Sequence, residues 1–369
     1  MTKSSPPPRA SKSASELDTL TVPSESRDSA DPEWQRLLGE VARGATFVPS
    51  PRAFDALMAP GARLGEYEVV EQLGQGSFGT VYRARQPLIG KEVAVKVLGA
   101  QFSANRETVR RFINEARVVN QIRHPNIVDI FGFGELESGQ KYYVMQLLSG
   151  ESLASRIKRT GRLAPESALA ILESVASALD AAHAHRVVHR DLSAGNVFLA
   201  EDSEGHVVVK LLDFGVARIP AGSATLATRT GALLGTPAYM SPEQCLGARD
   251  IDHHADIYAL GVITHEALTG QRPFVSKSLA GLASMHTQTT PPRVSESGAP
   301  ELARLDQPVL SMLEKVPKNR PDSASTAIAA LALAWRAPEP RPKHRPRLLV
   351  GLLALALLSM SIYFALCAR

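Results

Sequence analysis

Residues 189–196 read His-Arg-Asp-Leu-Ser-Ala-Gly-Asn, and a second aspartate, Asp213, follows a short apolar run further along the chain. In phosphoryl transfer, one carboxylate orients a hydroxyl nucleophile, while an amide and a second carboxylate hold Mg²⁺ against the phosphates. Asp191, Asn196 and Asp213 match these roles in type and spacing, so they indicate metal-assisted phosphoryl transfer. A His-Arg-Asp tripeptide also occurs by chance. The surrounding elements must therefore show whether it belongs to a catalytic site.

The glycine-rich stretch of residues 74–79, Gly-Gln-Gly-Ser-Phe-Gly, stands between two predicted strands, residues 67–73 and 80–85. Glycines let backbone N–H groups approach phosphate oxygens because no Cβ stands in the way. Dinucleotide sites use the same spacing, but there a helix follows the glycines. Here a β-branched segment returns as a strand, which favours a hairpin that covers phosphates.

Lys96 lies inside an otherwise apolar strand, residues 92–98, where a charge is costly unless it has a charged partner. Bound phosphate is one candidate partner, and a carboxylate on the helix predicted for residues 105–122 is another. Glu115 is the carboxylate that we favour. Glu107 is its rival, but an acid in the first turn of a helix is explained by the helix dipole.

The order of the elements predicts two lobes. Residues 141–148 form a further apolar strand, after which residues 153–159 and 165–185 show helical periodicity. A set of strands followed by a set of helices implies an α+β fold with a cleft where the two parts meet. A strand at residues 207–212 delivers Asp213, residues 218–235 have the composition of a loop, and helices are predicted from Asp256 and up to Trp335.

Composition excludes several classes of protein. The 369 residues are 44% hydrophobic and 21% charged, as in globular proteins that bury a large core. The net charge of +4 lies partly in the two tails, so no nucleic-acid surface is indicated.

Cys245 and Cys367 are too far apart for a disulfide framework or a zinc spacing. His253, His254 and Asp256 lack a further spaced ligand, and we interpret them as structural residues.

The two ends of the chain differ in kind. Residues 1–62 are rich in Ser, Pro and Ala and predict a disordered, low-complexity tail. Residues 348–366 are 19 uncharged residues, long enough for a transmembrane helix. The basic, Pro-rich linker of residues 337–347 precedes this helix and only residues 367–369 follow it. The positive-inside rule therefore predicts a single-pass protein of the inner (cytoplasmic) membrane, with residues 63–336 on the cytoplasmic side.

Taken together, residues 67–335 resemble the protein kinase superfamily, specifically the bacterial eukaryotic-like serine/threonine protein kinases. The resemblance implies a small β-rich N-lobe, a large helical C-lobe, ATP and Mg²⁺ as cofactors, and protein Ser/Thr hydroxyls as acceptors. It makes Asp191 the catalytic base, beside Arg190, and makes Asn196 and Asp213 the metal ligands. Lys96 would contact the phosphates and pair with Glu115. The residues implied to bind nucleotide, with Met145 as gatekeeper and a hinge after it, are Leu73, Gly74, Gln75, Gly76, Ser77, Phe78, Gly79, Thr80, Val81, Lys96, Met145, Gln146 and Leu148.

Ser193 departs from the family pattern, because serine/threonine kinases usually carry a lysine two residues after the catalytic aspartate. The residues 193–195, Ser-Ala-Gly, look more like the tyrosine-kinase form of this loop. Against this, residues 235–239, Gly-Thr-Pro-Ala-Tyr, have the serine/threonine form of the substrate-binding turn. We therefore expect Ser/Thr specificity and slow transfer. The alternatives are a pseudokinase or nucleotide-binding scaffold, and a kinase of small molecules.

Thr228 and Thr230 lie where related kinases are autophosphorylated. Our hypothesis is that phosphate on either residue orders the loop through Arg190. The resemblance also allows a homodimer, in which two copies of the chain phosphorylate each other. Glu243 resembles the glutamate that pairs with a late arginine, here Arg320. The expected partners are protein substrates and the membrane, with no nucleic acid.

Overall fold

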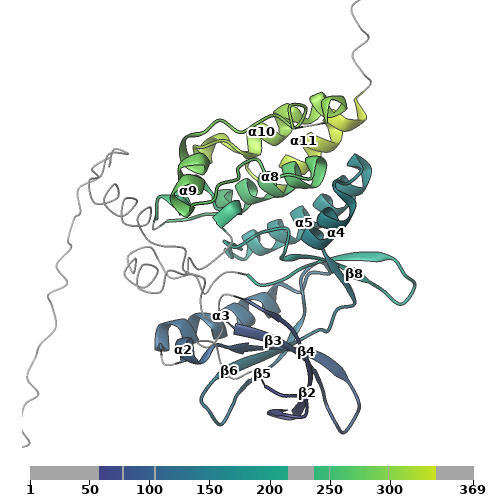
Figure 1. The fold of residues 1–369 in the computed structure, drawn as a ribbon, viewed down its shortest axis with the longest axis vertical. Helices are drawn as coiled ribbons and strands as arrows, with labels where there is room; N and C mark the ends of the chain where they lie inside the picture. Colours follow the sequence, from purple (N-terminus) through teal and green to yellow (C-terminus); the bar gives the residue numbers. More distant parts are fainter. Residues whose placement is uncertain are drawn as a thin grey trace, which may run out of the picture. The chain divides into compact units, whose positions relative to one another are not determined.

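The computed structural model describes residues 58–76, 79–103, 105–214, 237–248, 250–297 and 299–337 (Figure 1). The side chains of residues 101, 107, 111, 114–116 and 118 are also outside the description. Several predicted features therefore lie outside the described residues: the tail before residue 58, Ser77 and Phe78, the loop with Thr228 and Thr230, and the segment 348–366. Within the described ranges, no helix combines the length and apolar character that crossing a bilayer requires.

A six-stranded antiparallel sheet carries the first part of the chain, in the strand order β1-β2-β3-β4-β6-β5. Each strand pairs with its neighbour in antiparallel register. The strands are β1 (Arg63–Leu64), β2 (Tyr67–Gln75), β3 (Gly79–Arg85), β4 (Glu92–Leu98), β5 (Ile130–Glu135) and β6 (Lys141–Met145). The predicted hairpin of two strands around the glycines is confirmed, as β2 and β3.

Successive side chains along each strand point to opposite faces of this sheet. Along β6, Tyr142 and Val144 belong to a small cluster on one face, whereas Tyr143 and Met145 belong to the large core on the other. The large core also contains Phe112 of helix α3 (Arg106–Ile122), which follows the short helix α2 (Ala100–Ser103). Asn105 caps α3, because its Oδ1 accepts the backbone N–H of Thr108 at 3.1 Å.

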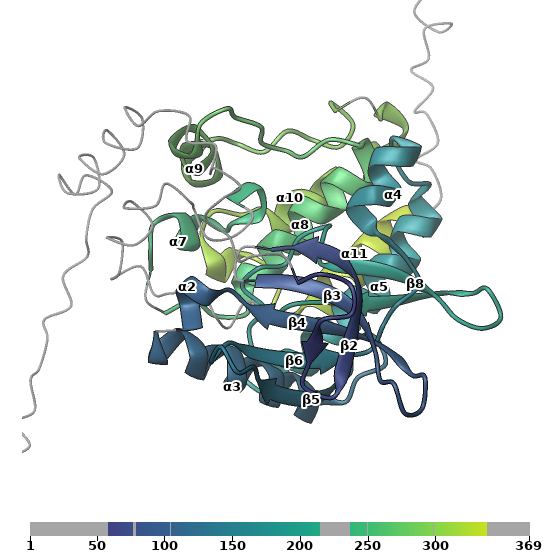
Figure 2. The ribbon, with the colours of Figure 1, turned by 60° about the horizontal axis from the view of Figure 1, so that its bottom comes forward.

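Helices dominate the second part of the chain (Figures 1 and 2). Helix α8 is its centre, since nearly every residue of this helix is buried and α5, α10 and α11 pack on it. The longer helices are α4 (Leu153–Thr160), α5 (Pro165–Ala184), α8 (His254–Thr269), α9 (Leu279–Gln288), α10 (Asp306–Met312) and α11 (Ala324–Arg336). The shorter ones are η3 (Pro237–Tyr239), α7 (Pro242–Cys245), η4 (Pro300–Leu305) and η5 (Pro317–Asn319). The β-rich part and the helical part together form the predicted bilobal α+β fold.

A small sheet of β7 (Gly150–Ser152), β8 (Val197–Glu201) and β9 (Val207–Leu211) lies beside these helices. Strand β9 also links the two lobes. Its Leu211 forms an isolated parallel bridge with Ile127, and the backbone N–H of Val128 donates to the carbonyl of Leu211 at 3.1 Å. The hairpin of β8 and β9 is therefore fixed against the segment that leads from α3 to β5.

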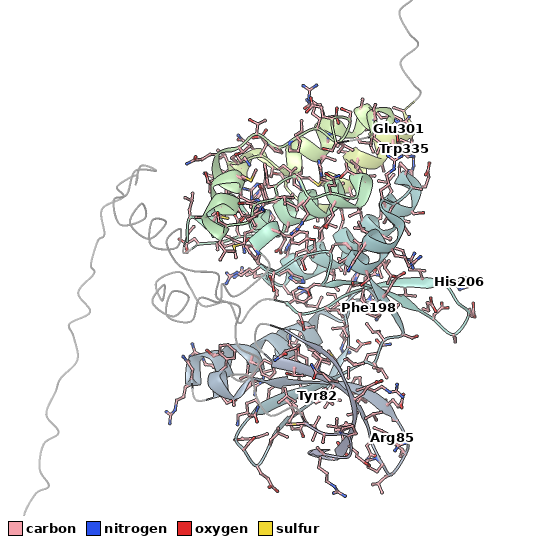
Figure 3. All side chains as sticks on the ribbon, in the orientation of Figure 1. Tyr82, Arg85, Phe198, His206, Glu301 and Trp335 are labelled. Carbon is pink, nitrogen blue, oxygen red and sulfur yellow. The ribbon has the colours of Figure 1, made fainter. Side chains whose placement is uncertain are left out.

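Side-chain contacts also fix the end of the described chain. The guanidinium of Arg304 lies 3.8 Å from the ring centroid of Trp335, and the Nε1 of Trp335 donates to Glu166 at 3.0 Å. Figure 3 labels Trp335 beside Glu301 at this corner of the helical lobe. The last turns of helix α11 are thus fixed against η4 and the start of α5.

Candidate active site

A carboxylate of α8 forms hydrogen bonds with the backbone of the loop that carries Asp191. Asp256, with 1% of its surface exposed, accepts the backbone N–H groups of His189 at 2.7 Å and Arg190 at 2.8 Å. The Nε2 of His183 lies 2.8 Å from the same carboxylate. Arg190 has a φ of 62°, which is uncommon for a residue with a Cβ and needs such support.

His189 connects this loop to the segment before Asp213. Its ring is fully buried, and its Nε2 donates to the carbonyl of Leu212 at 3.0 Å. The ring also packs on Phe214, with 4.5 Å between the centroids. Burial lowers the pKa of His189, so the imidazole stays neutral and acts as a spacer between two loops.

Asn196 and Asp213 come together because of a strand pairing. Asn196 directly precedes β8, and Asp213 follows β9 closely. These antiparallel strands place Val197 opposite Leu211, so the start of one strand meets the end of the other. The Nδ2 of Asn196 donates to the carbonyl of Asp191 at 2.8 Å. This bond fixes the amide so that its oxygen is the atom left to bind a cation.

Lys96 reaches this point from the other lobe. Its Nζ lies 2.7 Å from Oδ1 of Asp213, and the Tyr143 hydroxyl donates to the same oxygen at 3.1 Å. Burial on its own would raise the pKa of Asp213, but the Lys96 ammonium and these hydrogen bonds outweigh it and hold the pKa below the usual carboxyl value. Asp213 is therefore an anion, as a metal ligand must be. The side chain of Glu115, the predicted partner of Lys96, lies outside the described residues.

The predicted nucleotide loop is formed by the ends of β2 and β3. Gly79 needs its glycine, since a Cβ there would lie 1.9 Å from the carbonyl oxygen of Val97. A Cβ on Gly74, by contrast, would meet nothing within 4 Å, which leaves open space above that strand. Leu73 and Gln75 are on β2 and Thr80 and Val81 on β3, while the N–H of Gly76 donates to the carbonyl of Gly79 at 2.8 Å.

The predicted hinge begins where β6 ends, at Met145, which is 8% exposed. The strand was predicted to continue to Leu148, but β6 ends at Met145, opposite Ile130 at the start of β5. The N–H of Gln146 donates to the carbonyl of Asp129 at 3.0 Å, directly beyond this last pair. Leu148 packs partly buried against the large core. The hinge segment thus runs from the β-rich lobe toward β7 of the helical lobe.

These residues fit a nucleotide and a divalent cation by the chemistry of their donors. Asn196 and Asp213 offer oxygen atoms, which hard divalent cations prefer. Lys96 offers an ammonium group close to them, the partner that phosphates require. Glycine backbone with open space beside Gly74 is the kind of surface on which a phosphate chain can lie.

The turn formed by η3 and α7 is anchored to the same site. Gln244 donates from Nε2 to the carbonyl of Arg190 at 2.8 Å, and a small pocket beside Asp191 is lined by Tyr239 and Met240. The predicted pair of Glu243 and Arg320 is confirmed, with two contacts of 2.8 Å each. The side chain of Arg320 is fully buried, so this is a buried ion pair within the helical lobe.

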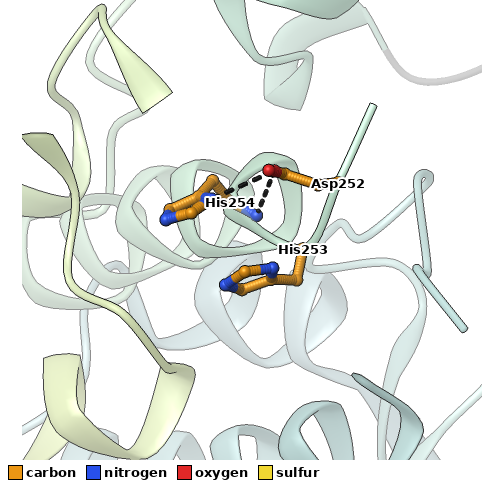
Figure 4. Close-up of side chains that lie close together, drawn as sticks. All are labelled: Asp252, His253 and His254. Carbon is orange, nitrogen blue, oxygen red and sulfur yellow. Dashed lines mark hydrogen bonds and ion pairs between the residues drawn. The ribbon is translucent and has the colours of Figure 1, made fainter. Parts of the chain in front are cut away.

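A second group of ligand-type side chains lies at the start of α8. Asp252, His253 and His254 bring one ligand atom each within 4.8 Å of the others (Figure 4). One nitrogen of each histidine already has a partner: the Nδ1 of His254 lies 3.1 Å from Asp252, and the Nε2 of His253 lies 3.1 Å from the carbonyl of Asp322. Asp256 is not part of this group, since its carboxylate faces the catalytic loop.

Two residues of the site were missed by sequence reasoning. Asp256 was weighed only as a metal ligand, and Tyr143 only as part of a strand. In both cases the available signal was a polar group inside an apolar element, because such a group must find a partner there.

Residues 67–336 match the protein kinase domain family. Serine/threonine-protein kinase Pkn1 of Myxococcus xanthus is 40% identical over 287 residues, which cover 78% of this chain and 40% of that protein. Serine/threonine-protein kinase PknA of Mycobacterium tuberculosis is 37% identical over 289 residues, covering 76% and 64%. The chain thus spans 40% to 64% of these relatives.

Among solved structures, the PknI kinase domain of Mycobacterium tuberculosis superposes with a TM-score of 0.60 at 29% identity. That match covers 76% of this chain and all of the solved domain. Fold, site geometry and sequence agree: the chain belongs to the protein kinase family and resembles the bacterial serine/threonine kinases within it.

Proposed function

We propose that this chain is a membrane-anchored protein-serine/threonine kinase that transfers the γ-phosphoryl group of ATP, with Mg²⁺ as its metal. The observation that carries the proposal is the meeting of Lys96 and Asp213 at 2.7 Å, beside the loop with Asp191 and Asn196. A cation for phosphate, two oxygen ligands for a metal and a carboxylate base are the parts that phosphoryl transfer requires.

In this mechanism Asp191 orients the acceptor hydroxyl and accepts its proton. Lys96 binds the phosphates, and the glycines at the ends of β2 and β3 cover them with backbone N–H groups. Asn196 and Asp213 would hold Mg²⁺, which when bound neutralises the charge of the phosphates. The bonds from Asp256 to His189 and Arg190 keep the base in place, so catalysis depends mainly on positioning.

The test is incubation of the purified chain with radiolabelled ATP, Mg²⁺ and a protein acceptor, beside an Asp191→Ala control. Label on Ser or Thr that depends on Asp191 supports the proposal. Binding of nucleotide without transfer would favour a pseudokinase scaffold, and label on a metabolite alone would favour a small-molecule kinase.

Autophosphorylation of Thr228 or Thr230 is part of the proposal. The phosphate would pair with Arg190, whose backbone is fixed by Asp256 and Gln244, and so order the loop that precedes η3. A Thr228→Ala/Thr230→Ala double variant should phosphorylate substrate more slowly than the parent chain. Equal rates would refute this part of the proposal and leave the kinase assignment intact.

Membrane attachment rests on residues 348–366, whose 19 uncharged residues suit a single span. The four basic residues of the linker, Arg341, Lys343, Arg345 and Arg347, favour a cytoplasmic kinase domain. Labelling of Cys367 by an impermeant thiol reagent tests the orientation. Labelling in intact cells supports it, whereas labelling only after lysis would contradict it.

A further inference from the structure

The hydroxyl group of Tyr143 is directed at the site from inside the β-rich lobe. Tyr143 lies on β6 directly opposite Lys96 of β4, so the two side chains stand on the same face of the sheet. Only 2% of the surface of Tyr143 is exposed, and its hydroxyl donates to Oδ1 of Asp213 at 3.1 Å. The Nζ of Lys96 contacts the same oxygen at 2.7 Å.

Packing alone does not require a hydroxyl group at this position. The ring of Tyr143 lies in the large apolar core, where a phenylalanine would fill nearly the same volume. A buried hydroxyl is costly unless it forms a hydrogen bond, and a bond to a charged group is among the stronger ones. The polar atom of Tyr143 is therefore explained by Asp213.

Tyr143 also connects Asp213 to helix α3. Its ring packs against Phe112 with 5.0 Å between the centroids, and Phe112 packs in turn on Phe133 at 5.9 Å. Phe112 precedes Glu115 by one helical turn. A shift of α3 would thus reach Asp213 through two aromatic rings.

We propose that Tyr143 is a positioning residue that holds Oδ1 of Asp213 when Lys96 turns to the phosphates, which leaves Oδ2 to the divalent cation. In the structure both donors contact Oδ1. When the ammonium of Lys96 binds phosphate, Tyr143 remains as the donor that keeps the carboxylate from rotating. This inference rests on the proposed function, because it concerns the metal ligand of that same site.

The test is calorimetric binding of a non-hydrolysable ATP analogue to the full chain, once with Mn²⁺ and once with EDTA. Tyr143→Phe should weaken binding with Mn²⁺ by about tenfold, the size of one hydrogen bond to a charged group, and leave binding in EDTA unchanged. Tyr142→Phe is the matched control. It removes a hydroxyl from the adjacent residue, which faces the opposite side of the sheet, and should change neither affinity.

The outcomes separate the inference from the proposed function. A selective loss with Mn²⁺ supports the role of Tyr143. Equal losses with Mn²⁺ and with EDTA would indicate a merely structural residue and overturn the inference, as would unchanged binding in both. A parent chain that binds no nucleotide under either condition would overturn the proposed function as well. Thermal unfolding of both variants verifies that the fold is retained.

Discussion

The carboxylate of Asp256 fixes the backbone of Arg190 in a left-handed conformation. Its Oδ1 accepts the N–H of Arg190 at 2.8 Å, and its Oδ2 accepts the N–H of His189 at 2.7 Å. Arg190, at a φ of 62°, directly precedes Asp191. A buried residue of α8 thereby determines where the proposed catalytic base stands, although it touches no substrate.

Replacing Asp256 should therefore reduce the rate and spare nucleotide binding. In Asp256→Asn the amide accepts from one backbone N–H only, so the loop loses a bond and Asp191 shifts. We expect kcat to fall by about 10- to 100-fold, because small displacements of a catalytic group have effects of this size. KM for ATP should stay near that of the parent, since Lys96 and the glycine loop are untouched. Steady-state kinetics provide the measurement.

Asp306→Asn is the matched control for this prediction. Asp306 is also buried, and it accepts from the backbone and the hydroxyl of Ser295, far from the catalytic loop in sequence. This variant should lose stability while kcat is retained. A similar fall of kcat in both variants would mean that general destabilisation, and not loop position, explains the effect of Asp256.

The buried ion pair of Glu243 and Arg320 should stabilise the folded chain. The guanidinium forms two contacts with Glu243 and also donates to the carbonyls of Glu314 and His254. Lysine cannot reproduce this planar fork. Lysine keeps the charge but leaves buried acceptors without their hydrogen bonds, so Arg320→Lys should lower the free energy of unfolding by about 1–3 kcal/mol in urea titrations.

An exposed arginine serves as the comparison for Arg320. The side chain of Arg83 is 36% exposed and pairs with Glu71 and Glu92 at 3.0 Å each. Solvent and salt screen exposed pairs, so Arg83→Lys should change the free energy of unfolding little. If the two substitutions cost the same, burial of the Glu243 pair has no special part in stability.

Ser193 should limit the rate of transfer, because no cation follows the catalytic aspartate at the position where relatives carry lysine. Loss of such an electrostatic contact costs on the order of 2.7–4 kcal/mol in the transition state. Ser193 is only 3% exposed, so the stem of a lysine there would run along the loop to bring its ammonium to the surface. We expect Ser193→Lys to raise kcat at least about tenfold.

The control for Ser193→Lys is Ser193→Met, which has a similar length and no charge. Only the charged variant should be faster than the parent in the same radiolabel assay. Should both variants be as slow as the parent or slower, a different group already supplies the charge, and the slow rate expected from the sequence would be wrong.

The elements of this fold could be predicted because their signals are local. The hairpin around the glycines, the strand with Lys96 and the helix that ends at Ile122 each follow from the periodicity of a short segment. The site contacts that were missed join distant parts of the chain. Tyr143 and Asp213 meet only after β4, β6 and β9 are assembled, and Asp256 meets Arg190 only when α8 packs beneath the catalytic loop.

The predicted bounds of one strand and one helix differ from the observed bounds by two or three residues. The strand predicted to reach Leu148 ends at Met145, because its partner strand β5 begins at Ile130, opposite Met145. The helix predicted to begin at Asp256 begins at His254, whose N–H donates to Asp252 at 3.0 Å. The pairing of a strand is set by tertiary structure and the start of this helix by one local hydrogen bond, and periodicity carries no signal for either.

His286 should make the fold sensitive to mild acid. Its ring is fully buried, and the hydroxyl of Tyr258 lies 2.9 Å from its Nδ1. Burial, together with the charges of Lys315 and Arg272, lowers the pKa of His286 from 6.5 to about 4. Between these pH values the unfolded chain takes up a proton that the folded chain does not bind. The free energy of unfolding therefore falls as the pH drops from 6.5 to about 4, by roughly 3 kcal/mol for this residue.

Urea titrations of the parent and of His286→Gln across this pH range isolate the effect, because all other titrating groups are shared. The parent should lose more stability on acidification than the variant, and the difference should appear below pH 6.5 and level off near pH 4. If the His286 variant parallels the parent, the buried ring takes up its proton in the folded chain, and the proposed acid sensitivity has another source.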